Sequence, residues 1–369
     1  MLDFLENELK ELARQGLLRE VAAERPDLVD VASNDYLGYA REPVSRATLL
    51  ECEGEPGAGA SRLIFGTTGA HLELEAALAD WVGLHSALLF SSGYAANLGL
   101  LQALCGPEDL VVSDALNHAS IIDGCRLSRA RVVVVPHLDL PAFARALTTP
   151  ARRRFVITES YFSMDGHQAD LRGVKAVSDA AGAFLLVDEA HALGSYGPQG
   201  AGLCRAAGVV PDALVGTLGK AIGVQGAFIA GGASLQRWLW NRARSLVFST
   251  GTSPILARLA LRHVRRAQAD DTGRARLTQV SAALRSRLLD AGLRLPAEST
   301  GPIVPILLGD NQRALRVADA LRAEGFRAQA IRPPTVPAGG ARIRITLSTA
   351  LDDATLDRLA TCLIRACSE

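Results

Sequence analysis

The sequence predicts an α/β protein: a large domain with a mostly parallel sheet flanked by helices, and a small α+β domain at the C-terminal end. Its 369 residues are many for one compact domain, and 49% of them are hydrophobic, enough for a large core. Short apolar runs alternate with helical stretches up to about residue 230. These runs are apolar throughout, as in strands buried on both faces of a parallel sheet.

The elements of the large domain follow from hydrophobic spacing. Leucines at positions 2, 5, 9 and 12 have helical spacing, so an amphipathic helix is expected within residues 2–21. A glycine-rich stretch, residues 54–69, interrupts regular structure before a helix at Leu72–Trp81. The strand-length runs are Ala87–Phe90, Leu110–Ser113, Arg131–Val135, Phe155–Glu159, Phe184–Asp188, Ala213–Leu218 and Ala227–Ala230. Helices are expected between several of them, at Tyr94–Leu104 and Leu171–Ala181.

The C-terminal part has a different pattern. Residues 233–290 are helical in pattern and rich in arginine. Strands at Ile303–Leu308 and Ile343–Leu347, with helices at 311–325 and 352–367, predict the smaller α+β domain. The expected organisation is an N-terminal helix and arm (1–40), a large domain (41–265) and a small domain (266–369).

Composition excludes several classes of function. The 39 basic residues balance 39 acidic ones, which argues against a nucleic-acid or acidic-membrane partner. No apolar stretch approaches the length of a membrane span, and the acidic N-terminus lacks the pattern of a signal peptide. The six cysteines show no CxxC pair, which predicts free thiols in a reducing cytoplasm.

One lysine has an unusual setting. The chain contains only three lysines, and Lys220 lies among small residues directly after an apolar run, in the segment Val215–Gly223. A lysine amine can form an imine with an aldehyde, whereas the guanidinium of arginine stays protonated. The position therefore favours covalent chemistry over a solvated surface charge.

A carboxylate ends one of the predicted buried strands. Asp188 follows Phe184–Val187, and His191 lies three residues further on. A lone aspartate there is commonly a helix cap or half of an ion pair, because a buried carboxylate needs a partner. It can also pair with a protonated ring nitrogen. A metal site of Asp188, Glu189 and His191 is a third interpretation, but no second cluster supplies further ligands.

Two further segments fit an anionic, aromatic ligand. Ser92-Gly93-Tyr94 follows a strand and opens a helix, so its free N–H groups can bind an anion, although a plain helix cap has the same pattern. The hydroxyl of Thr217, three residues before Lys220, can reach the same anion. His118 is either a structural histidine or a flat ring that stacks on a cofactor.

Together these residues fit pyridoxal phosphate. A lysine forms the imine, an aspartate keeps the ring nitrogen protonated, and a helix N-terminus with hydroxyl groups holds the phosphate. The competing class, a nucleotide-binding or dehydrogenase-like protein, would need a strand-GxGxxG-helix segment, and the chain has none.

Several motifs in order resemble one family, the α-oxoamine synthases, which are fold-type I pyridoxal-phosphate enzymes. The motifs are residues 33–38, 57–62, 66–71, 92–97, 117–120, 159–166, 188–194 and 217–220. The resemblance implies that Lys220 carries the cofactor and moves protons, that Asp188 pairs with the ring nitrogen, and that His118 stacks on the ring. It implies that His191 and Ser163 lie on the side of the ring hydroxyl. The phosphate would be held by Gly93, Tyr94 and Thr217, and by Thr250 of a second subunit in a homodimer with shared active sites.

The resemblance also implies substrates. The segment Ile331–Pro337 is similar to that of members that use L-alanine, with Arg332 and Asn34 holding the carboxylate; Thr335 and Arg19 would also contact substrate. The implied reaction is a decarboxylating condensation of L-alanine with pimeloyl-CoA or a pimeloyl acyl carrier protein, in biotin biosynthesis. The alternative is a glycine-using relative such as 2-amino-3-ketobutyrate CoA ligase. No metal is implied.

Overall fold

The computed structural model describes residues 2, 4–19 and 25–368. By its internal contacts the chain divides into two units. The small unit comprises Met1–Tyr36, Ser163–His167 and Ala275–Glu369, and the large unit comprises Leu37–Phe162 and Gln168–Arg274. The breaks expected from the sequence, after residues 40 and 265, lie close to two of the observed ones.

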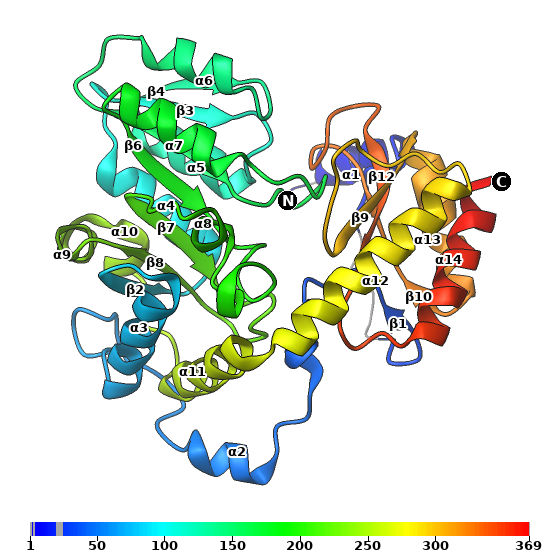
Figure 1. Cartoon of the computed structure of the whole chain (residues 1–369), viewed down its shortest axis with the longest axis horizontal. Helices are drawn as coiled ribbons and strands as arrows, with labels where there is room; N and C mark the ends of the chain where they lie inside the picture. The colour runs from blue at the N-terminus through cyan, green and yellow to red at the C-terminus, as the bar shows by residue number, and fades with distance from the viewer. Residues whose placement is uncertain (1, 3, 20–24, 369) are drawn as a thin grey trace. The chain divides into compact units, whose positions relative to one another are not determined.

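The large unit is built on a seven-stranded sheet with the order β2-β8-β7-β6-β5-β3-β4 (Figure 1). Strands β3 to β7 pair in parallel, and β8 is antiparallel to both of its neighbours. The strands are β2 (Ser86–Phe90), β3 (Leu110–Asp114), β4 (Arg131–Val135), β5 (Arg154–Glu159), β6 (Phe184–Asp188), β7 (Ala213–Thr217) and β8 (Ala227–Gly231). The predicted α/β class and mostly parallel sheet are confirmed.

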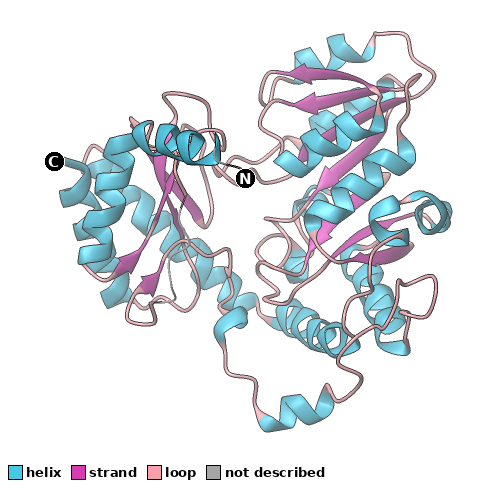
Figure 2. Ribbon diagram, turned by 180° about the vertical axis from the view of Figure 1, so that it is seen from behind, coloured by secondary structure: helices cyan, strands magenta, loops and turns pink. Residues whose placement is uncertain are grey.

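Helices flank this sheet (Figure 2). The helices of the large unit are α2 (Arg46–Glu51), which lies on loops away from the sheet, α3 (Gly69–Val82), α4 (Gly93–Leu104), α5 (Ala119–Ser128), α6 (Leu140–Leu147), α7 (Leu171–Ala180), α8 (Leu203–Ala207), α9 (Ala233–Arg242), α10 (Arg244–Val247) and α11 (Pro254–Ala269), with 3₁₀ turns η1 (Tyr39–Arg41) and η2 (Pro198–Gly200). Helix α12 (Asp271–Asp290) begins in the large unit and continues in the small one.

One face of the sheet carries the main core and leads to the candidate site. Side chains on a strand alternate between faces, so every second residue shares a face. Phe155 and Ile157 of β5 belong to the same buried cluster as Leu186 of β6 and Val215 of β7, together with residues of α4 and α5. The next side chains on that face are Glu159, Asp188 and Thr217, at the C-terminal ends of their strands. Parallel sheets place ligands at this edge.

The small unit holds two short sheets. Strands β11 (Gln329–Ile331), β12 (Ala341–Thr346) and β9 (Ile303–Gly309) form an antiparallel sheet, and β1 (Val29–Asp30) pairs in parallel with β10 (Phe326–Arg327). Its helices are α1 (Phe4–Arg14), α13 (Asn311–Ala323) and α14 (Asp353–Ser368). Strands β1, β10 and β11 were not predicted, because two or three residues are too few to show a period.

Two further expectations can be compared with the structure. The N-terminal amphipathic helix is present as α1, shorter than residues 2–21, and its leucines at positions 5, 9 and 12 are exposed. All six cysteines are free and buried. None of the helices in the described residues combines the length and apolar character that crossing a bilayer requires.

Candidate active site

Lys220 lies in the tight connection between β7 and β8. The turn is closed by hydrogen bonds from the Leu218 N–H to the Gly226 carbonyl and from the Gly223 N–H to the Lys220 carbonyl, at 2.9 and 2.8 Å. Gly223 has φ +71°, and a β-carbon there would lie 2.6 Å from the backbone nitrogen of Ala40. This close packing allows only glycine and fixes the backbone that carries the lysine.

Asp188 is buried at the end of β6 and is fully paired. Its Oδ1 accepts the backbone N–H of Ala190 at 2.8 Å, and its Oδ2 accepts the side-chain N–H of Asn97 at 2.7 Å. Asn97 lies on α4 and also donates to the hydroxyl of Ser120 at 2.9 Å. The carboxylate is therefore held in one orientation by α4 and by its own loop. Asn97 was not singled out from the sequence; it is a member of the 92–97 motif, which was the available signal.

The N-terminus of α4 lies beside Thr217. A β-carbon on Gly93 would lie 4.0 Å from Thr217 Oγ1, and Ser92 caps the helix by accepting the Ala95 N–H at 3.1 Å. The hydroxyl of Tyr94 donates to Asp123 at 2.6 Å, so only its backbone N–H remains at the helix end for an anion. Free N–H groups, the helix dipole and a hydroxyl together suit a phosphate group.

Two histidines lie at the same edge of the sheet. His118 caps α5, its Nδ1 accepting the Ser120 N–H at 3.2 Å. Burial lowers the pKa of His118; the negative charge of Asp188 opposes this shift and the positive charge of Lys220 adds to it. The charges of Asp188 and Lys220 therefore both act on His118. His191 is 6% exposed, in the loop that follows Asp188.

The remaining predicted side chains fall in two clusters of the small unit. In the first, Ser163 and Asn34 are joined by Arg344, whose Nε donates to the Ser163 carbonyl at 2.6 Å and whose Nη2 donates to Asn34 Oδ1 at 2.7 Å. Arg344 is buried on β12 and was not predicted. Its sequence setting, an arginine inside an apolar strand, was the signal that could have found it.

The second cluster contains Arg19, Arg332 and Thr335. Arg19 Nη2 donates to Thr335 Oγ1 at 3.1 Å, and Arg332 donates to the Gly16 carbonyl. Burial lowers the pKa of Arg332, and the positive charge of Arg19 lowers it further. Two guanidinium groups this close form a positive region that favours an anion. The structure thus groups Asn34 with Arg344, whereas the sequence interpretation had grouped it with Arg332.

Thr250 follows the turn that carries Lys220 in the sequence and does not belong to that turn. It is exposed and forms an isolated antiparallel bridge with Ser61. Its expected contribution to a second subunit stays a prediction.

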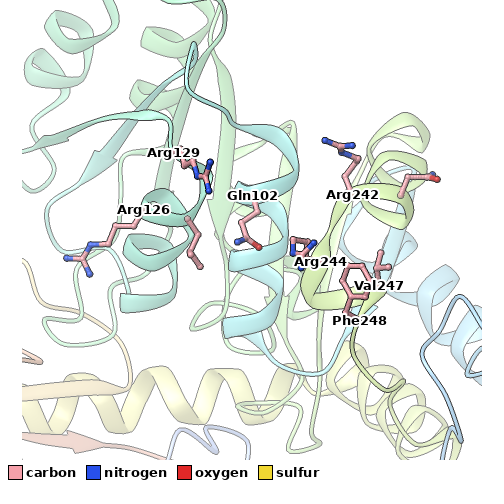
Figure 3. A pocket seen from close by; sticks show the side chains of 9 residues that line it. Gln102, Arg126, Arg129, Arg242, Arg244, Val247 and Phe248 are labelled. Carbon is pink, nitrogen blue, oxygen red and sulfur yellow. The ribbon is translucent and has the colours of Figure 1, made fainter.

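An arginine-lined groove of about 610 Å³ opens between α5 on one side and α9 and α10 on the other (Figure 3). Arg126 and Arg129 lie on the α5 side, and Arg242 and Arg244 lie opposite, with Gln102 of α4 between them. Arg244 stacks over the ring of exposed Phe248 at 4.8 Å. Among the described residues that line the groove there is no aspartate or glutamate; Arg126 is paired with Asp123 at 3.2 Å, and Arg129, Arg242 and Arg244 add to the positive charge.

A metal centre was one interpretation of Asp188, Glu189 and His191. Within the part of the chain that the structure describes, no group of three or more His, Cys, Asp or Glu side chains is arranged to hold a metal ion. The carboxylate of Glu189 instead accepts the N–H groups of Leu203 and Cys204, both at 2.9 Å.

The family model for aminotransferase class I and II matches residues 26–363. The chain belongs to this family. A curated relative, 8-amino-7-oxononanoate synthase of Anaeromyxobacter dehalogenans, is 44% identical over 96% of this chain and 93% of its own length. The solved serine palmitoyltransferase of Sphingomonas wittichii is similar with a TM-score of 0.90 and 29% identity, covering 99% of this chain and 96% of that one. The 8-amino-7-oxononanoate synthase structure from Francisella tularensis, at 24% identity, shows the same fold with a TM-score of 0.78 and covers 92% and 97% of the two chains.

These comparisons confirm the resemblance to the α-oxoamine synthases, the fold-type I architecture and pyridoxal 5'-phosphate as the cofactor. The chain is therefore a pyridoxal-phosphate-dependent acyltransferase. The residues present fit the cofactor. A buried, doubly hydrogen-bonded Asp188 suits a protonated ring nitrogen, and the glycine at the start of α4, beside Thr217, leaves room for a phosphate.

Proposed function

We propose that this chain joins L-alanine to a pimeloyl thioester with loss of carbon dioxide and release of the thiol, in biotin biosynthesis. The observation that carries the proposal is the 44% identity to an 8-amino-7-oxononanoate synthase over nearly the whole chain, with the lysine turn, Asp188 and His118 in one site. We place the reaction in the cytoplasm, in a homodimer whose Thr250 reaches the phosphate of the partner's site.

Each residue of the large unit has one task in this reaction. Pyridoxal phosphate supplies an electron-withdrawing ring that stabilises negative charge at Cα of the amino acid. The Lys220 amine would hold the cofactor, and its nitrogen is the group that would move the Cα proton. Asp188, held by Asn97 and the Ala190 N–H, favours a protonated ring nitrogen through its negative charge. The neutral, flat ring of His118 can stack on the cofactor without adding charge.

The small unit supplies candidates for the substrate carboxylate. The sequence interpretation gives this task to Arg332 and Asn34, with Arg19 and Thr335 nearby. We add Arg344 as a second candidate, because it is buried and bonded to both Asn34 and Ser163. A guanidinium fixed by two hydrogen bonds is already oriented and loses little entropy when it binds a carboxylate.

The arginine-lined groove is our candidate for the anionic end of the acyl donor. Helix α4 starts at Gly93, and His118 caps the start of α5. The groove residues Gln102 and Arg126 lie nine residues after Gly93 and eight residues after His118. At 1.5 Å per residue this separation is roughly 12–14 Å. A thioester on a long pantetheine arm can have its phosphate in the groove while its carbonyl reaches the site.

The experiment that tests the function measures thiol release. Free thiol should appear with L-alanine and pimeloyl-CoA, and more slowly with glycine and acetyl-CoA; the reverse order would assign the chain to a glycine-using activity. Lys220→Arg should abolish turnover, because a guanidinium neither binds the aldehyde nor accepts a proton. Lys175→Arg is the matched control, since Lys175 lies on the surface and pairs with Asp179.

A further inference from the structure

Glu159 is a second buried carboxyl group directly beside Asp188. It ends β5, is 3% exposed, and stands opposite Asp188 in the parallel register of β5 and β6. Adjacent strands are about 4.8 Å apart, and paired residues of parallel strands point to the same face. The two carboxyl groups therefore face the same site, although the reaction described above uses only Asp188.

Hydrogen bonds tie Glu159 to the turn that carries His118. The Glu159 N–H donates to Asn117 Oδ1 at 3.1 Å, and Asn117 Nδ2 donates to the carbonyl of Ile157 at 2.9 Å. The Glu159 carboxyl accepts the backbone N–H of His118. Glu159 and Asn117 thus fasten the start of α5 to the end of β5, which sets the position of the His118 ring.

The hydrogen-bond donors distinguish Glu159 from its neighbour Asp188. Each oxygen of Asp188 accepts a hydrogen bond, whereas Glu159 Oε1 has no partner among the described residues. A buried carboxylate with an unpartnered oxygen is costly, and two adjacent carboxylates seldom both ionise. A neutral acid needs fewer donors than an ionised one.

The two largest effects of the surroundings on the pKa of Glu159 both raise it. Burial raises the pKa of Glu159, and the negative charge of Asp188 on β6 adds to the rise; the positive charge of Lys220 and the His118 N–H oppose it, and Asp114 at the end of β3 raises it slightly. These groups face Glu159 from β6, the lysine turn, α5 and β3.

We propose that Glu159 is a positioning residue that works as a neutral carboxylic acid, holding the His118 backbone in place and leaving Asp188 as the negatively charged member of the pair. The inference rests on the cofactor site and not on which amino acid or thioester the enzyme uses. Its tests therefore use no substrate, so their failure is distinct from a failure of the proposed reaction.

The first test is infrared spectroscopy of the holoenzyme in H₂O and D₂O at neutral pH. The wild-type spectrum minus that of Glu159→Gln should contain a carbonyl band of a protonated carboxylic acid that deuteration shifts; any band of Glu189 is common to both proteins and cancels. The band should weaken in alkaline solution. Glu108→Gln, at an exposed carboxyl on the same unit, is the control and should leave the band unchanged. No difference in this band between the wild type and Glu159→Gln overturns the proposal.

The second test is cofactor affinity and the visible absorption of the bound cofactor as a function of pH. Glu159→Gln keeps a neutral acceptor for the His118 N–H. Its dissociation constant for pyridoxal phosphate should therefore stay within about 3-fold of the wild-type value, and the pH profile of the cofactor absorption should be unchanged. Glu159→Asp withdraws the carboxyl from that N–H, so affinity should fall about 10-fold or more.

Both variants keep a buried polar side chain, and circular dichroism checks that they fold. A Gln variant that binds the cofactor as poorly as the Asp variant shows that the ionised form is needed and overturns the proposal. Equal, wild-type affinity of both variants shows that the His118 contact does not matter and overturns it as well.

Discussion

Asn97 on α4 donates a hydrogen bond to Asp188 Oδ2 at the end of β6, at 2.7 Å. Because Asn97 also donates to Ser120 of α5, one buried amide connects α4, the end of β6 and the helix that follows His118. The orientation of Asp188 therefore depends on helix packing and not on its own strand alone.

Replacing this amide should weaken cofactor binding. Asn97→Ala removes one of the two donors to a buried carboxylate; a hydrogen bond to a charged group contributes about 1.5–3 kcal/mol, so the cofactor dissociation constant should rise roughly 10- to 100-fold. The measurement is visible absorbance during titration of apoenzyme with pyridoxal phosphate. Asn241→Ala, at an exposed asparagine bonded to the Arg237 carbonyl, is the control and should bind as the wild type does. Unchanged affinity of Asn97→Ala would exclude a role in binding.

The two arginine clusters of the small unit can be separated by kinetics. If Arg344 binds the substrate carboxylate, Arg344→Gln should raise KM for L-alanine about 10- to 100-fold, because it removes a charge-assisted bidentate contact, and should leave KM for the thioester unchanged. Arg332→Gln should then have the smaller effect on KM for L-alanine. The opposite ranking would assign the carboxylate to Arg332 and leave Arg344 with a structural role.

Charge reversal in the arginine-lined groove should act on the acyl donor alone. Arg129→Glu combined with Arg242→Glu should raise KM for the thioester about 5- to 20-fold and reduce its dependence on salt, since exposed charges act through screened attraction. KM for L-alanine should not change. Arg237→Glu, on the same helix α9 but outside the groove, is the matched control. Comparing pimeloyl-CoA with a pimeloyl carrier protein then shows which donor the groove favours.

Glu189 should make stability depend on pH. Burial raises the pKa of Glu189 to about 7 from 4.5, so the folded state holds a proton that the unfolded state loses. The contribution of Glu189 to the free energy of unfolding is therefore largest below pH 4.5. It falls as the pH rises to about 7 and stays level above that pH. Urea unfolding of wild type and Glu189→Gln across this range measures it. As the pH rises from 4.5 to about 7, the free energy of unfolding of the wild type should fall relative to that of Glu189→Gln. A difference that stays constant over this range contradicts the assignment.

Much of the large unit could be predicted because its signals are local. Strands β2 to β8 are continuous apolar runs, and each was placed to within a residue or two at its ends. Lys220, Asp188 and His118 could be selected because each side chain has an unusual sequence setting. The smaller pieces could not be found this way: β1 and β10 have two residues each, and they form only because segments almost 300 residues apart meet.

The sequence by itself determined the α/β class and the cofactor, since these depend on residue types and on spacing along the chain. Only the tertiary structure decided which side chains meet. The parallel register of β5 and β6 places Glu159 beside Asp188, and the packing of α4 brings Asn97 onto that carboxylate. Likewise, Asn34 meets Arg344 across 310 residues of chain. Such contacts are set by packing and by the need of buried polar groups for partners, which no local pattern records.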